Sequence, residues 1–127
     1  MIQRLYAFCG WGIVALGGLH MSATPRFFDA LTGSALWFFS GGITMVLAGS
    51  INLLNRSYGR HAAGLRWACV GTNFLILAFA IVSGIVGRAS FGQFAIVLGL
   101  IGGATVLSTT RSAWRTLPHS LVNFEAG

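Results

Sequence analysis

Four long apolar runs restrict the fold of this chain more than any other feature. They cover residues 5–21, 34–54, 67–86 and 91–109, and an α-helix needs roughly 17 to 25 such residues to cross a bilayer. The chain is 55% hydrophobic and only 8% charged, whereas soluble domains carry about 25% charged residues. The sequence therefore predicts an all-α membrane protein, with its 127 residues forming a single bundle of four transmembrane helices.

The arginines predict how these runs are arranged and oriented. The polar segment 55–66 separates two pairs of runs, so we expect two hairpins joined by an Arg-rich loop. This loop and the terminal segments hold Arg4, Arg56, Arg60, Arg66, Arg111 and Arg115, whereas the other two turns hold Arg26 and Arg88. Because positively charged flanks favour the cytoplasm, we expect the loop and both termini there, with residues 110–127 as a cytoplasmic tail. A bacterial-type inner membrane is the expected location.

The formal net charge of +6 raises the question of nucleic-acid binding. A nucleic-acid interface would gather its cations on one face. Here the arginines lie at the edges of apolar runs, where topology and contact with anionic lipid headgroups account for them. We expect membrane lipid as a partner and no nucleic acid.

The first run and the connection after it have alternative interpretations. The run is also compatible with a signal peptide cleaved after Ala23, although Met21 is a poor fit to the small residue that such sites prefer. Segment 22–33 is either a short interfacial helix that begins at Pro25 or a polar loop with anchoring aromatic residues.

A candidate ligand-binding site lies in the two turns expected to face outward. His20, Arg26 and Asp29 are the one grouping of an imidazole, a cation and an acid near a membrane surface, and Trp37 and Arg88 belong to the same layer. If the first helix ends soon after His20, Asp29 can fold back toward it. A carboxylate beside a histidine fixes the orientation of the ring and suits recognition of a polar group. The alternative is a lone interfacial histidine that binds a loop carbonyl.

Two asparagines lie within the apolar runs and must find partners there. Asn52 and Asn73 fall in the cytoplasmic halves of the second and third runs. They form either a clamp between helices or the lining of a polar pocket, together with Cys9 or Thr72. Cys9 and Cys69 fall on the reducing side, so we expect free thiols.

Small residues repeat every fourth position in the last run, at Ala95, Gly99 and Gly103. Such a stripe allows helix backbones to approach closely. It predicts a packing face, either within one chain or between copies in a homo-oligomer.

The rarity of acids argues against several functions. Only Asp29 and Glu125 are acidic, and both lie outside the runs, whereas proton-coupled transporters place an ionisable group within the membrane. In length and helix number the chain resembles the small multidrug-resistance transporters, but those carry a glutamate in the first helix, which is missing here. His61 and His119 fall on the opposite side from His20, so no facing pair could hold haem. We expect no metal, no cofactor and no catalytic residue.

The leading functional prediction is a small, non-enzymatic membrane protein that binds a partner protein or an apolar, lipid-like ligand at its outer face. The alternative is a subunit of an oligomeric small-molecule transporter or channel, for which the glycine stripe and the two asparagines would be the supporting features. An enzyme acting on a lipid or quinone would need an acid–base pair, and only His20 with Asp29 could supply one.

Overall fold

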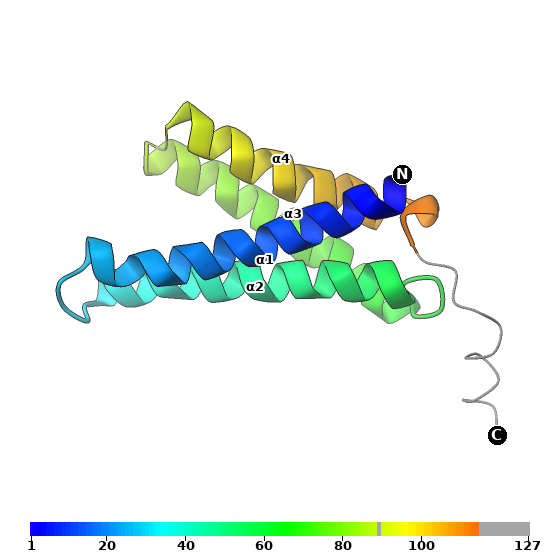
Figure 1. Ribbon diagram of the computed structural model, residues 1–127, viewed down its shortest axis with the longest axis horizontal. Coiled ribbons are helices and arrows are strands. Elements are labelled where there is room, and N and C mark those ends of the chain that lie inside the picture. Colours follow the sequence, from blue (N-terminus) through cyan, green and yellow to red (C-terminus); the bar gives the residue numbers. More distant parts are fainter. Residues whose placement is uncertain (89, 115–127) are drawn as a thin grey trace, which may run out of the picture.

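The chain forms four long helices, and the computed structural model describes residues 1–88 and 90–114. The helices are α1 (Ile2–Phe27), α2 (Gly33–Tyr58), α3 (Ala63–Val86) and α4 (Phe91–Ser108), followed by the short 3-10 helix η1 (Arg111–Ala113) (Figure 1). All four long helices are apolar enough to cross a membrane. The predicted all-α, four-helix membrane fold is therefore confirmed. Residues 115–127, most of the predicted tail, lie outside the described residues.

Both helices of the first hairpin are longer than the sequence predicts. α1 continues through Pro25 to Phe27, so segment 22–33 is neither an interfacial helix nor a long loop. A proline this close to the end of a helix removes only one backbone hydrogen bond. The Thr24 hydroxyl also donates to the His20 carbonyl oxygen one turn earlier (3.3 Å). A helix of 26 residues at about 1.5 Å per residue exceeds the ~30 Å hydrocarbon core, so its ends reach the headgroup layers or the helix tilts.

The α1–α2 hairpin is held by glycines on facing helix surfaces. Gly10 and Gly17 of α1 lie against Gly49 and Gly42 of α2. A Cβ atom on Gly17 would lie 2.6 Å from the Gly42 carbonyl oxygen, and one on Gly49 would lie 2.7 Å from the Gly10 carbonyl oxygen. The seven-residue spacing within each helix keeps both glycines on one face. The bare backbones can therefore touch along the hairpin.

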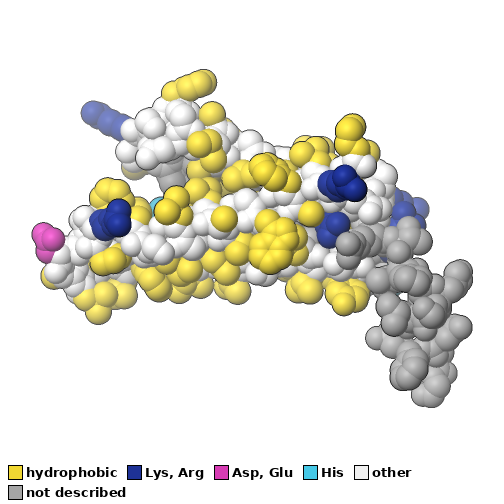
Figure 2. Space-filling model, viewed as in Figure 1, with side chains coloured by type: hydrophobic (Ala, Val, Ile, Leu, Met, Phe, Trp, Pro, Cys, Tyr) yellow, Lys and Arg dark blue, Asp and Glu magenta, His cyan; other side chains and the backbone are white. Residues whose placement is uncertain are grey.

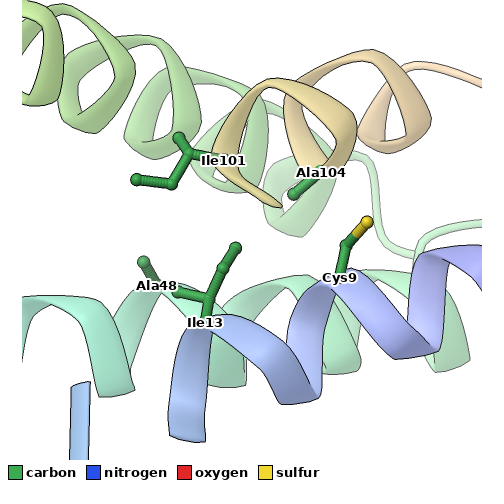
Figure 3. Packing of buried hydrophobic residues seen from close by; sticks show 5 residues of the cluster. All are labelled: Cys9, Ile13, Ala48, Ile101 and Ala104. Atoms are coloured by element: carbon green, nitrogen blue, oxygen red, sulfur yellow. The ribbon is translucent and has the colours of Figure 1, made fainter. Parts of the chain in front are cut away.

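The two hairpins pack together at one end of the molecule only. Their shared core contains Cys9, Ile13, Ala48, Ile101 and Ala104, contributed by α1, α2 and α4 (Figure 3). The structure has no buried residue in α3 beyond Asn73 and none in α4 before Ile101. The α3–α4 hairpin accordingly diverges from α1–α2 beyond this core (Figure 1).

The ends of the bundle carry different charges. The arginine-rich end contains the N-terminus, the α2–α3 turn and η1, and its cations are Arg4, Arg56, Arg60, Arg66 and Arg111. The opposite end contains the α1–α2 and α3–α4 turns, with Arg26, Asp29 and Arg88. Figure 2 shows dark-blue arginines near both ends and hydrophobic side chains along the length between them. This distribution is the one expected of a protein that crosses a bilayer.

Candidate functional site

A group of buried polar side chains joins the helices near the arginine-rich end. We call it the amide cluster, and it consists of Tyr6, Asn52, Asn55, Cys69 and Asn73. None of these residues is more than 1% exposed. Burial at this level makes partners inside the protein necessary, and of the side-chain oxygen and nitrogen atoms of the cluster, Asn55 Oδ1 has none among the described residues.

The two predicted asparagines form the centre of the amide cluster. Asn52 Nδ2 donates to Asn73 Oδ1 (2.7 Å), and Asn73 Nδ2 donates in return to Asn52 Oδ1 (2.9 Å). Asn52 Nδ2 also donates to the Ala48 carbonyl oxygen of its own helix (2.8 Å). The paired amides directly bridge α2 and α3.

Further hydrogen bonds extend the cluster to all four helices. Tyr6 of α1 donates its hydroxyl proton to Asn52 Oδ1 (3.0 Å) and accepts from Asn55 Nδ2 (2.9 Å). Asn55 Nδ2 also lies 3.3 Å from the Ser108 carbonyl oxygen at the end of α4. The Cys69 thiol donates to Asn52 Oδ1 (3.4 Å). The arrangement clamps the hairpins at one depth.

Sequence reasoning found part of this cluster and missed the rest. Of the predicted companions, Cys9 packs in the apolar core, and Thr72 forms no hydrogen bond with the described residues of the cluster. Asn55 was assigned to a polar loop, but α2 continues past it to Tyr58. The available signal was spacing, because residues three or four apart share a helix face: Asn55 follows Asn52 by three positions and Asn73 follows Cys69 by four.

The predicted site at the opposite end has an aromatic centre. The His20 ring stacks on Phe38 with centroids 3.8 Å apart, and Phe27 and Phe28 pack against the same Phe38 ring at 5.8 and 5.7 Å. Gly41 lies beside the imidazole, and a Cβ atom there would be in van der Waals contact with His20 Nε2 at 3.5 Å. These contacts close the end of the α1–α2 hairpin.

The other residues predicted for that site do not contact His20 in the structure. Asp29 is exposed in the α1–α2 turn and forms no ion pair with His20 within the described part of the chain. The reason is the length of α1, which carries the turn about 10 Å further along the helix axis than the imidazole. Arg26, Trp37 and Arg88 are also exposed, and Arg88 adopts a left-handed backbone (φ 50°) in the α3–α4 turn.

The small-residue stripe of α4 is mostly open. A Cβ atom on Gly99 would meet nothing within 4 Å, and Ala95 is exposed. Gly103 alone has a close neighbour, since a Cβ atom there would lie 3.2 Å from Cys9 Sγ. Within one chain, therefore, the stripe packs only at its Gly103 end.

The thiols and the possible metal ligands complete the description of the polar groups. Cys9 and Cys69 are both free and buried. In the parts of the chain that the structure describes, no group of three His, Cys, Asp or Glu side chains is arranged to hold a metal ion.

No protein-family model, curated protein or solved structure matches this chain. The function therefore has to be argued from the amide cluster, the divergence of the hairpins and the distribution of charge.

Proposed function

We propose that this chain is a non-enzymatic, multi-pass protein of a bacterial-type inner membrane that binds an apolar partner between its two hairpins. The partner is a lipid-like molecule or a membrane segment of another protein. It would enter at the end that carries His20, Asp29, Trp37 and Arg88. The divergence of the hairpins beyond the shared core is the observation that supports this proposal.

The pattern of burial supports a binding space at that end. Buried side chains join the hairpins up to Ile13, Asn73 and Ile101. Partly buried side chains such as Ala80 and Val97 continue this packing, and beyond them the two hairpins separate; Figure 2 shows a notch between them. A space between apolar helices is a common place for ligand sites.

His20 lies on α1 at the level where the hairpins diverge, and its ring stacks on Phe38 of α2 beside the notch. His20 follows Ile13 by seven positions and so lies on the same face of α1. Ile13 packs in the shared core with Ile101 of α4. One face of α1 therefore meets α4 at Ile13 and carries a half-buried imidazole at His20. His20 would offer a polar contact beside an otherwise apolar ligand.

Filling the notch is expected to reduce ligand retention. The full-length protein, purified gently in detergent, should carry an apolar compound or a membrane protein in near-stoichiometric amount, measured by mass spectrometry of extracts and by gel. His20→Trp should lower the retained amount several-fold, because the indole occupies the notch. Gly71→Trp is the control, since a Cβ atom on Gly71 meets nothing within 4 Å and the added indole does not enter the notch. Equal retention by His20→Trp and the wild type would contradict the proposal.

A subunit of an oligomeric transporter or channel is the second candidate. The open Gly99 and exposed Ala95 favour it, because small residues leave a smooth surface on which a second copy can pack. Flux measured in proteoliposomes separates this candidate from the binding protein.

The proposed orientation predicts opposite labelling of two exposed positions. Cysteine replaces Ala30 in the α1–α2 turn or Ala63 at the start of α3. Native Cys9 and Cys69 can remain because both are buried. With the Arg-rich loop in the cytoplasm, Ala30→Cys should react with an impermeant maleimide on intact cells, and Ala63→Cys only after permeabilisation. The reverse pattern would refute this orientation.

A further inference from the structure

A cavity at the arginine-rich end is separate from both the amide cluster and the notch. It has a volume of about 390 Å³ and is lined by Arg60, His61, Arg66, Arg111 and Trp114. These residues come from the α2–α3 turn, the first turn of α3, and η1 with the residue that follows it. Three segments far apart in the sequence thus contribute three guanidinium groups to one cavity.

One of these guanidinium groups is held in place. Arg66 Nη1 donates to the Gly59 carbonyl oxygen (3.1 Å), and its Cζ lies 5.3 Å from the centroid of the Trp114 ring. A cation over an indole face is favourable. The Trp114 backbone is itself anchored, because its carbonyl oxygen accepts from Gln3 Nε2 (3.1 Å). The cavity therefore has a preorganised cation in its wall.

Trp114 forms a buried part of the cavity wall. Trp114 is only 5% exposed, and its indole Nε1 has no hydrogen-bond partner among the described residues. A buried donor without a partner costs free energy. Nε1 has less than 1 Å² of accessible surface, so the indole shapes the wall of the cavity and does not present its N–H to a ligand there.

The three arginines that line the cavity form no salt bridge with a described acid. Asp29 lies in the turn at the opposite end, and Glu125 lies outside the described residues. A cavity with three guanidinium groups and no described acid is complementary to an anion. Arginine binds phosphate oxygens through paired N–H donors.

We propose that this cavity binds the phosphate headgroup of an anionic phospholipid. Arg66 is the fixed contact, held against the Trp114 ring, and Arg60 and Arg111 are the flanking cations. The position supports a lipid, because the cavity lies at the ends of membrane-spanning helices, at the level where headgroups and tryptophan side chains meet.

The test compares phosphatidylglycerol with phosphatidylcholine in mixed micelles, using native mass spectrometry of the full-length chain to count retained lipids. Wild type should retain the anionic lipid in clear preference. Arg66→Gln should reduce this preference roughly tenfold, because loss of one basic contact near the surface is worth about fivefold and the paired donors are lost as well. Arg26→Gln and Arg88→Gln remove the same charge at the opposite end and should change it less than about twofold.

A second variant and a competitor keep the result decisive. Arg60→Gln with Arg111→Gln alters only exposed side chains, so it should lower the preference even if Arg66→Gln unfolds this corner. Inorganic phosphate at millimolar concentration should not displace the lipid. Displacement by phosphate would show that the cavity binds a free anion. An equal loss of preference in Arg26→Gln would show that the net charge of the protein, and not this cavity, selects the lipid. Either result, or a wild type without preference, overturns the proposal.

Discussion

Asn52→Leu is expected to destabilise the folded protein by about 2 to 4 kcal/mol. The leucine has a similar size but removes the amide that accepts from Tyr6 (3.0 Å) and exchanges two hydrogen bonds with Asn73 (2.7 and 2.9 Å). A single hydrogen bond between membrane helices contributes only about 0.6 kcal/mol on average. The larger value follows because several buried groups lose their partners together. Reversible unfolding in mixed micelles, followed by circular dichroism, measures the change.

Ser50→Ala is the matched control for this prediction. Ser50 lies two positions earlier on α2, and its hydroxyl donates to the Val46 carbonyl oxygen of the same helix (2.8 Å). Its loss should cost less than about 0.5 kcal/mol. If Asn52→Leu and Ser50→Ala unfold at the same denaturant concentration, the amide cluster does not hold the hairpins together.

Gly17→Ala is expected to destabilise the α1–α2 hairpin by about 1 to 3 kcal/mol. The added methyl group would lie 2.6 Å from the Gly42 carbonyl oxygen and 2.9 Å from the Val46 backbone nitrogen. Because these are backbone atoms, no side-chain rotation can relieve the contact, and the helices must separate. Thermal unfolding in detergent measures the loss.

The neighbouring glycine provides the control. A Cβ atom on Gly18 would meet nothing within 4 Å, so Gly18→Ala should be neutral or stabilising, by up to about 1 kcal/mol from helix propensity. The two variants differ by one position on the same helix. Equal melting temperatures would show that the glycine contact between α1 and α2 does not limit stability.

The amide cluster illustrates what sequence reasoning could reach. An amide inside an apolar run needs a partner, so the sequence marked Asn52 and Asn73 as members of a polar contact. It did not identify Tyr6, because a tyrosine near the start of an apolar run is equally compatible with an interfacial anchor. It assigned Asn55 to a loop, because a polar stretch that begins at the end of a membrane run carries no mark of where its helix stops.

The site at the opposite end shows the same limit. His20 and Asp29 lie nine positions apart, and their distance depends on where α1 ends. The sequence favoured an end before Pro25. The helix continues to Phe27, and the imidazole stacks on Phe38 instead.

The glycines show most clearly the difference between what residue spacing predicts and what helix packing decides. A repeat of small residues predicts a smooth helix face from sequence alone, and the stripe at Ala95, Gly99 and Gly103 is regular. Close contact occurs instead where α1 and α2 face one another, at pairs such as Gly17 and Gly42. Spacing indicates which residues share a face, but the partner of that face depends on how the helices cross.

By itself, the sequence determined that the chain lies in a lipid bilayer, how many helices it forms and roughly where they begin and end. The reason is that each apolar run must satisfy its backbone hydrogen bonds within a helix of membrane length. Only the tertiary structure decided which faces meet, that Tyr6 binds Asn52 and Asn55, and that Arg66 lies over Trp114. Those contacts join residues more than forty positions apart. They depend on the packing of whole helices, which local hydrophobicity does not specify.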